Sequence, residues 1–251
     1  MWQPERTIVS NVCLAPRFES LKRLPYHLSS MKLLLTSAGV KNQSIKDALV
    51  EMLGKPIAES NALCIPTANY GHLGGLARAY DFIHGVASTP MLELGWKSVG
   101  VLELSALPLV PKEYWVPFVE GTDILLVNGG DPMFLYYWIR ESGLEALLPT
   151  LNDTVWMGLS AGSMVMAPNL GMDFVKWQMP GGGDKTLDIV DFAICPHLDH
   201  PDMPNNTLKD AEEWAATMSI PCYAIDDETA IRVVDGELDV ISEGHWKLLN
   251  A

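Results

Sequence analysis

Short runs of consecutive apolar residues alternate with amphipathic stretches from residue 31 onward. The apolar runs predict strands at 32–36, 62–66, 98–103, 123–127, 154–159, 189–195 and 222–226. The amphipathic stretches predict helices near 43–53, 74–85, 112–119, 132–148, 161–167 and 207–219. Nearly every position of 123–127 is apolar, which is typical of a central parallel strand covered by helices on both faces. The alternation therefore predicts an α/β fold with three layers and a doubly wound, mostly parallel sheet.

The two ends of the chain follow other patterns. Residues 229–234 and 238–241 are strand-like and flank Asp235-Gly236-Glu237, and Asp-Gly favours the turn of a β-hairpin. No repeat or low-complexity linker interrupts 31–251, so we count one domain there. Residues 1–30 lack clear periodicity and carry a small positive balance, so we expect them to form a loosely packed N-terminal extension.

Charge and apolar content exclude several classes of partner. The chain of 251 residues has a net charge of −14, whereas nucleic acids and anionic lipids both require a basic face. No apolar run approaches the roughly 20 residues that span a bilayer, and none resembles a secretory signal. Three of the four cysteines, Cys64, Cys195 and Cys222, lie in or beside apolar runs without CxxC spacing. We expect buried free thiols and a cytoplasmic protein.

The strongest chemical signal is Gly158-Leu159-Ser160-Ala161-Gly162, which joins a predicted strand to a predicted helix. A nucleophile elbow requires this context, because its turn is so tight that the residues two before and two after the serine must lack side chains. The Ser160 hydroxyl is then placed at a helix N-terminus, and the N–H of Ala161 is a natural oxyanion donor. A Gly-rich turn without function is the alternative interpretation, and the flanking strand and helix favour the nucleophile.

A second signal is Gly129-Gly130, which directly follows the strand predicted at 123–127. Ligands bind at the carboxyl ends of parallel strands in open α/β sheets, where free backbone N–H groups of glycines can face them. By itself this is a strand-to-helix connection that needs a positive φ. Together with Ser160, the loop becomes a candidate for the second half of an oxyanion hole.

Titratable side chains follow the last two predicted parallel strands. His197 ends the strand at 189–195 and can accept a serine proton and return it to the leaving amine. Asp226, Asp227 and Glu228 follow the strand at 222–226, and one of these acids can orient the histidine. These residues also allow structural or merely solvated interpretations.

A metal interpretation rests on the spacing of His197-x-x-His200 with Asp199 and Asp202 nearby. No third and fourth ligand with recognisable zinc spacing accompanies them, so we expect no metal site.

The order of these motifs resembles the peptidase E (aspartyl dipeptidase) and cyanophycinase group of serine peptidases over about residues 31–241. The resemblance implies a class I glutamine amidotransferase-like fold and hydrolysis of a small peptide substrate without metal or organic cofactor. It implies Ser160 as nucleophile, His197 as general base, and Gly130 and Ala161 as oxyanion donors. Homodimers are common for scaffolds of this kind, so a homodimer is an open expectation.

The acid of the triad is less defined by the resemblance. The family's Ile-Asp-Glu-x-Thr-Ala segment places its glutamate on Asp227 without gaps, and we prefer this residue. An acid between the serine and the histidine would instead be Asp173, and Asp226 also remains open.

Two departures from the family pattern bear on the site. The usual Gly-Gly-Asn reads Gly129-Gly130-Asp131 here, and we expect Asp131 to cap the following helix. Aspartyl dipeptidases hold the acidic side chain of the substrate with an arginine downstream of the histidine. Between His197 and Arg232 this chain has no arginine and only Lys209 as a cation, which puts a strict preference for N-terminal aspartate in doubt.

Two other functions compete with the peptidase. An α/β-hydrolase-type esterase would order its triad as Ser160, Asp226 and His245. A non-catalytic binding or sensor protein on the amidotransferase-like scaffold would keep the serine turn without its chemistry.

Overall fold

The computed structural model describes residues 31–251, so the extension expected at 1–30 lies outside the described residues. The strands are β1 (Lys32–Thr36), β2 (Asn61–Ile65), β3 (Ser98–Val101), β4 (Ile124–Val127), β5 (Val155–Leu159), β6 (Ala193–Cys195), β7 (Cys222–Ile225), β8 (Thr229–Val234), β9 (Glu237–Ser242) and β10 (Trp246–Leu249). The α-helices are α1 (Gln43–Leu53), α2 (Gly75–Ile83), α3 (Val116–Glu120), α4 (Pro132–Ser142), α5 (Ala161–Met164) and α6 (Leu208–Ala215). Short 3₁₀ turns are η1 (Ile57–Glu59), η2 (Thr67–Gly71), η3 (Leu104–Leu109), η4 (Lys112–Tyr114), η5 (Leu144–Ala146), η6 (Leu148–Thr150) and η7 (Met172–Phe174).

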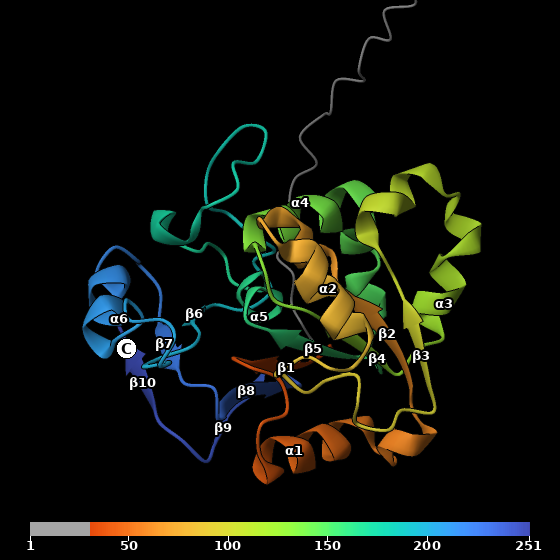
Figure 1. The fold of residues 1–251 in the computed structure, drawn as a ribbon, viewed down its shortest axis with the longest axis horizontal. Helices are drawn as coiled ribbons and strands as arrows, with labels where there is room; N and C mark the ends of the chain where they lie inside the picture. The colour runs from red at the N-terminus through yellow and green to blue at the C-terminus, as the bar shows by residue number, and fades with distance from the viewer. Residues whose placement is uncertain (1–30) are drawn as a thin grey trace, which may run out of the picture.

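The central sheet is mixed and mostly parallel, with strand order β3-β2-β4-β5-β1-β8-β9 (Figure 1). The first five of these strands pair in parallel, β8 pairs antiparallel with β1, and β9 pairs antiparallel with β8. Strand β4 is buried on both faces, because Leu125 and Val127 pack in one apolar cluster while Ile124 and Leu126 pack in the other. The predicted α/β class is confirmed.

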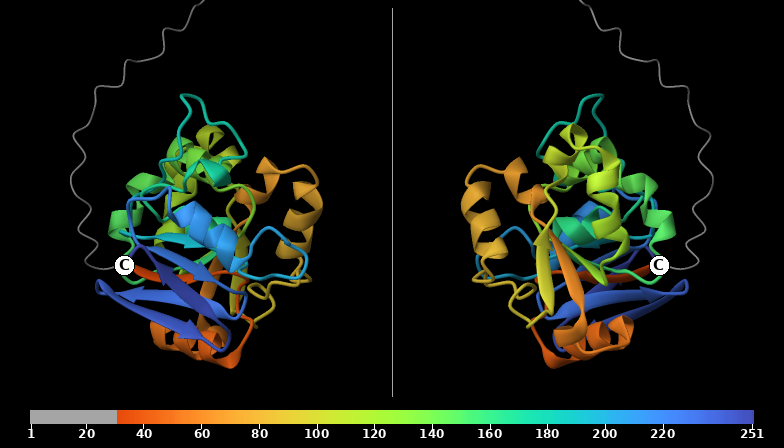
Figure 2. Two further views of the ribbon diagram at one scale, coloured as in Figure 1. Left: turned by 90° about the vertical axis from the view of Figure 1, so that its left-hand side faces the viewer. Right: turned by 90° about the vertical axis from the view of Figure 1, so that its right-hand side faces the viewer.

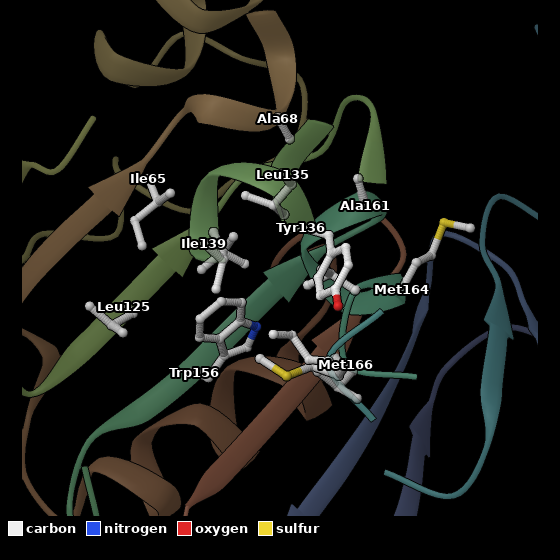
Figure 3. Packing of buried hydrophobic residues seen from close by; sticks show 14 of the residues in the cluster. Ile65, Ala68, Leu125, Leu135, Tyr136, Ile139, Trp156, Ala161, Met164 and Met166 are labelled. Carbon is white, nitrogen blue, oxygen red and sulfur yellow. The ribbon is translucent and has the colours of Figure 1, made fainter. Parts of the chain in front are cut away.

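Helices cover both faces of this sheet. Side chains of α1 pack in one cluster, and side chains of α4 and α5 pack in the other. The side views place α1 beneath the sheet and the green helices above it (Figure 2). In the cluster that contains side chains of α4 and α5, the fully buried Trp156 of β5 packs with Leu125, Ile139 and Met166 (Figure 3). The Trp156 indole N–H also donates to the Gly162 carbonyl at 2.9 Å, so the core supports the start of α5.

A second, smaller sheet accompanies the mostly parallel central sheet, and the sequence did not predict it. Strands β6 and β7 leave the central sheet and form a separate three-stranded sheet with β10, in the order β10-β7-β6. Only Ala193–Cys195 of the run predicted at 189–195 is a strand, and β10 was not expected. Helix α6 packs its Trp214 against this small sheet. Apolar runs identify strands but do not determine which strand each will pair with, since pairing is decided by tertiary contacts.

Other boundaries differ where a local residue ends the element. The helix expected at 132–148 stops at Ser142, because Gly143 adopts a φ of 82° and the chain continues in 3₁₀ turns. The bounds predicted for β1 and α1 are those observed. The hairpin is also confirmed: Asp235 and Gly236 have φ values of 52° and 79°, as the turn between twisted antiparallel strands requires.

Two expectations from composition can be compared with the described residues. Cys64, Cys195 and Cys222 are buried free thiols, as predicted, whereas Cys13 lies outside the described part of the chain. Across residues 31–251, no helix is both long and apolar enough to cross a membrane.

Candidate active site

Ser160 occupies the turn between β5 and α5 in a strained conformation. Its φ of 49° and ψ of −109° are unusual for a residue with a side chain. A Cβ atom at Gly158 would lie 2.4 Å from the Gly162 carbonyl oxygen, and one at Gly162 would lie 2.2 Å from the Val127 carbonyl oxygen. Only glycine at both positions lets α5 begin this close to the sheet, which leaves the serine at the carboxyl end of β5.

The loop after β4 contacts Ser160 from the neighbouring strand. The position of a Cβ on Gly129 would be 3.2 Å from Cβ of Ser160. Gly130 has a φ of 140°, which side chains disfavour, and a Cβ there would collide with the backbone of Ala68 at 2.3 Å. Gly130 is therefore required by the close approach of the Ala68 backbone and by its positive φ, whereas Gly129 leaves room for the side chains of Leu159 and Ser160.

Two buried asparagines orient the peptide group between these glycines. Asn128 Oδ1 accepts the Gly129 N–H at 2.8 Å, and Asn69 Nδ2 donates to the Gly129 carbonyl oxygen. The Asn128 side chain also donates to Asn69 Oδ1 at 3.2 Å. The C=O and N–H of a trans peptide point in opposite directions, so a fixed Gly129 carbonyl turns the Gly130 N–H away from Asn69.

Among the described residues, only two of the backbone N–H groups of Gly129, Gly130 and Ala161 are free to bind an oxyanion. The Gly129 N–H is already occupied by Asn128. The N–H groups of Gly130 and Ala161 donate to no protein acceptor within residues 31–251. These two groups are therefore the ones available to a developing oxyanion, while Gly129 contributes the space beside Ser160.

His197 and Asp227 form a hydrogen-bonded pair. They follow β6 and β7, which are parallel neighbours in the small sheet, so both residues emerge at the same edge. The His197 Nδ1 atom is 2.7 Å from Asp227 Oδ1. A carboxylate can only accept, so Nδ1 carries the proton of a neutral imidazole, and Nε2 is left as the acceptor.

The surroundings of Asp227 favour its charged form. Partial burial acts to raise the pKa of this carboxyl, but the hydrogen bond and charge of His197 act against it. A hydrogen bond from Ser37 and the charge of His200 add to the same side, and the net pKa lies below its usual value. Asp227 is therefore a stable anion opposite the imidazole.

These residues line one cavity of about 760 Å³. Ser160, Gly129, Gly130, His197 and Asp227 all contribute to its wall, so the structure brings together residues from both sheets. The side chain of Ala161, which follows Ser160, is fully buried.

Charged groups outside the expected catalytic set also line this cavity. They are Lys41, His72, Arg78, Asp81, His200 and Asp202. Lys41 and Arg78 come from segments upstream of Ser160, whereas the family resemblance pointed to a cation downstream of His197. Ser37 and Asn69 were missed as well. For Ser37 a usable signal existed, because it directly follows the buried strand β1.

The model of peptidase family S51 matches residues 33–241. The chain belongs to this family. It is therefore a serine-type peptidase. No curated protein matches its sequence.

Two solved structures share the fold of this S51 peptidase. One is a candidate peptidase E from Listeria monocytogenes EGD-e, with a TM-score of 0.61 and 19% identity over 86% of this chain and 99% of that chain. The other is a peptidase from an acI-B1 actinobacterium, with a TM-score of 0.63 and 18% identity over 88% of this chain and 95% of that chain. At these identities the likeness is one of fold.

The other acids considered for the triad lie elsewhere. Asp173 is exposed and borders a different pocket, beside Asp184. Asp226 binds His245, whose backbone N–H donates to Oδ2 at 2.7 Å and whose Nδ1 lies 3.0 Å from the same oxygen. The His245 side chain is 58% exposed and does not line the cavity of Ser160. The esterase arrangement of Ser160, Asp226 and His245 is thus not assembled in this S51 peptidase.

Asp131 caps α4, as predicted. Its Oδ1 accepts the Phe134 N–H at 2.9 Å, and its Oδ2 accepts the Trp177 N–H at 2.9 Å. The side chain is fully buried by these contacts, so its charge is satisfied by backbone donors and also anchors the segment around Trp177. No group of three or more potential ligand side chains within 31–251 is arranged to hold a metal ion.

Proposed function

We propose that this S51 peptidase hydrolyses short peptides, as a dipeptidase does, through an acyl-enzyme formed on Ser160. His197 acts as the general base and acid, and Asp227 orients it. The observation that carries the proposal is that the hydrogen-bonded pair of His197 and Asp227 lines the same cavity as Ser160.

The first half of the reaction follows from the hydrogen bonds of the site. Asp227 holds the Nδ1–H of His197, so Nε2 can take the proton of the Ser160 hydroxyl while its oxygen attacks the scissile carbonyl carbon. The negative charge that develops on the carbonyl oxygen is stabilised by the N–H groups of Gly130 and Ala161. The C–N bond then breaks, and His197 returns the proton to the leaving amine.

The second half releases the acyl group. Water gives its proton to His197 Nε2 as its oxygen attacks the ester carbon of the acyl-enzyme. When the ester bond breaks, the proton passes back to the Ser160 oxygen, and the free carboxylic acid leaves. Apart from the substrate and the attacking water, the groups that take part in both halves are side chains and backbone N–H groups of this chain.

The size and charge of the cavity support a short substrate. A volume of about 760 Å³ lies within the range of pockets that enclose small molecules. Lys41 and Arg78 supply positive charge, and Asp81 and Asp202 supply negative charge to its wall. A dipeptide carries an ammonium and a carboxylate group only a few bonds apart, and both can find an opposite charge there.

A dipeptide library tests the proposal. The wild type, Ser160→Ala and the exposed control Ser98→Ala are compared over dipeptides with acidic, basic and apolar N-terminal residues. We expect Ser160→Ala to lose hydrolysis by at least about 10³-fold, because the nucleophile is removed, and Ser98→Ala to match the wild type. Hydrolysis by Ser160→Ala within tenfold of the wild type would exclude the mechanism.

A further inference from the structure

Ser37 contacts both partners of the histidine–acid pair. It directly follows β1 and is fully buried. Its hydroxyl donates to Asp227 Oδ1 at 3.0 Å and accepts the backbone N–H of His197 at 2.8 Å. One side chain from the central sheet is therefore bonded to two residues that follow strands of the small sheet.

The number of available protons determines the direction of each bond. A serine hydroxyl has one proton and two acceptor lone pairs. The carboxylate of Asp227 can only accept, so it receives that proton, and the His197 N–H occupies a lone pair of the hydroxyl. The separation of 3.4 Å between Ser37 Oγ and His197 Nδ1 is then a close approach without donation from Ser37. Oδ1 of Asp227 receives two donors, which are the Ser37 hydroxyl and the Nδ1–H of His197.

The Ser37 hydroxyl also holds the backbone of His197 in an uncommon conformation. His197 has a φ of 60°, in the left-handed region that only a few per cent of residues with side chains adopt. Such conformations persist only where the surroundings fix them. The bond from the His197 N–H to Ser37 Oγ is one such contact, and it fixes the direction in which the imidazole leaves the chain.

The residue before Ser37 is bonded to the nucleophile turn. The Thr36 carbonyl oxygen accepts the Ser160 N–H at 3.0 Å and the Ser163 hydroxyl at 2.8 Å. The pair Thr36-Ser37 is thus hydrogen-bonded to Ser160, His197 and Asp227. It is a common support for groups that come from two different sheets.

We propose that Ser37 is a positioning residue that aligns His197 and Asp227 with Ser160. The inference rests on the proposed function, because it assigns Ser37 a role in the alignment of that triad. Ser37 acts through the two other residues and takes no proton from the substrate. Loss of its hydroxyl leaves the acid with one donor fewer and the His197 N–H without its acceptor.

The test compares Ser37→Ala with Ser37→Thr, which keeps the hydroxyl, and with Ser37→Cys, which keeps the volume but has a weaker donor and acceptor. Ser60→Ala is the matched control, because Ser60 is also fully buried and its hydroxyl donates to one carbonyl, that of Pro56, at 3.1 Å. Each variant is measured for kcat and KM on the best dipeptide of the wild type, for Tm, and for the downfield proton resonance of the His197 Nδ1–H.

We expect Ser37→Ala to lower kcat by about 10- to 100-fold, as the loss of a hydrogen bond to a charged group allows. KM should stay within about threefold, because the substrate does not touch Ser37. The downfield resonance should weaken or vanish in Ser37→Ala and persist in Ser60→Ala. Ser37→Thr should recover most of kcat, and Ser37→Cys should lose it at a Tm near that of the wild type.

Either of two results would overturn the inference. One is a kcat for folded Ser37→Ala within threefold of the wild type; if that variant does not fold, the same result in Ser37→Cys decides the point. The other is an equal loss of kcat in folded Ser37→Thr and Ser37→Ala. Ser160→Ala in the same series separates this failure from that of the proposed function: an inactive Ser160→Ala beside an active Ser37→Ala rejects only the role of Ser37.

Discussion

The Nε2 atom of His200 lies 3.5 Å from Oδ2 of Asp227, the carboxylate oxygen that His197 leaves free. The two imidazoles therefore flank a single carboxylate. His200 lines the cavity, whereas Oδ1 on the other side is shared by His197 and Ser37. Asp227 thus contacts His197, His200 and Ser37 at once. Its ionisation should therefore affect both activity and stability.

The lowered pKa of Asp227 predicts how stability depends on pH. The ionised form is favoured in the folded protein, so its contribution is complete above the unfolded pKa of about 3.9 and is lost as the pH falls through the lower folded pKa. Asp227→Asn should therefore unfold at lower urea concentration than the wild type at pH 7. The difference should shrink below about pH 4, where the carboxyl becomes protonated. Urea titrations at a series of pH values measure this, and a difference that stayed constant with pH would contradict it.

His197 and His245, which each contact an aspartate, predict opposite outcomes on mutation. His197→Ala should lower kcat by at least about 10³-fold, because the general base is lost. His245→Ala should leave kcat within about threefold, since His245 lies outside the cavity and its effect is limited to contacts with Asp226 and Asp199. Steady-state kinetics on one dipeptide decide between them. The reverse pattern would support the esterase arrangement instead.

Mutation of Asn69 should slow catalysis, although Asn69 forms no hydrogen bond with Ser160. Asn69→Asp replaces the donor of the bond to the Gly129 carbonyl with a carboxylate oxygen, which repels that carbonyl and disturbs the direction of the Gly130 N–H. We expect kcat to fall by about 10- to 1000-fold, up to the value of one lost oxyanion donor. The exposed Asn205→Asp adds the same charge elsewhere and should match the wild type. Equal kinetics for the two variants would show that the amide network does not orient the donor.

The three buried cysteines should be unreactive toward thiol reagents in the folded protein. Burial raises the pKa of Cys64 and of Cys195 to about 12 and that of Cys222 to about 11. Thiolates are the reactive form, so these thiols should react very slowly at pH 7.5. In a Cys13→Ser variant, Ellman's reagent should detect no thiol within minutes under native conditions and three in guanidinium chloride. Rapid reaction of one thiol in the native protein would show that the burial is incomplete.

Much of the fold could be predicted from local patterns in the sequence. The bounds of β1 and α1 follow from apolar periodicity, and the Asp235-Gly236 turn follows from the positive φ values that its residue types accept. Gly158 could be interpreted in the same way, because a Cβ there would collide with the carbonyl oxygen of Gly162, only four residues along the chain. Sterics and periodicity are properties of neighbouring residues, so a sequence displays them directly.

The pairing of acids with histidines was decided by the tertiary structure. Asp226 and Asp227 are adjacent and chemically alike, yet one binds His245 and the other binds His197. Both aspartates lie in the tight connection between β7 and β8, and only the packing of the small sheet determines which histidine lies beside which acid. No spacing in the chain distinguishes the two aspartates.

The sequence by itself determined that this protein is an α/β chain with a serine in a Gly-x-Ser-x-Gly turn and a histidine after an apolar strand. Only the tertiary structure decided that the histidine strand belongs to a second sheet and that Ser37 and Asn69 support the site. The first set depends on contacts within a few residues. The second depends on hydrogen bonds between groups 160 or 190 positions apart for Ser37 and 60 for Asn69, and such bonds exist only once the chain has folded.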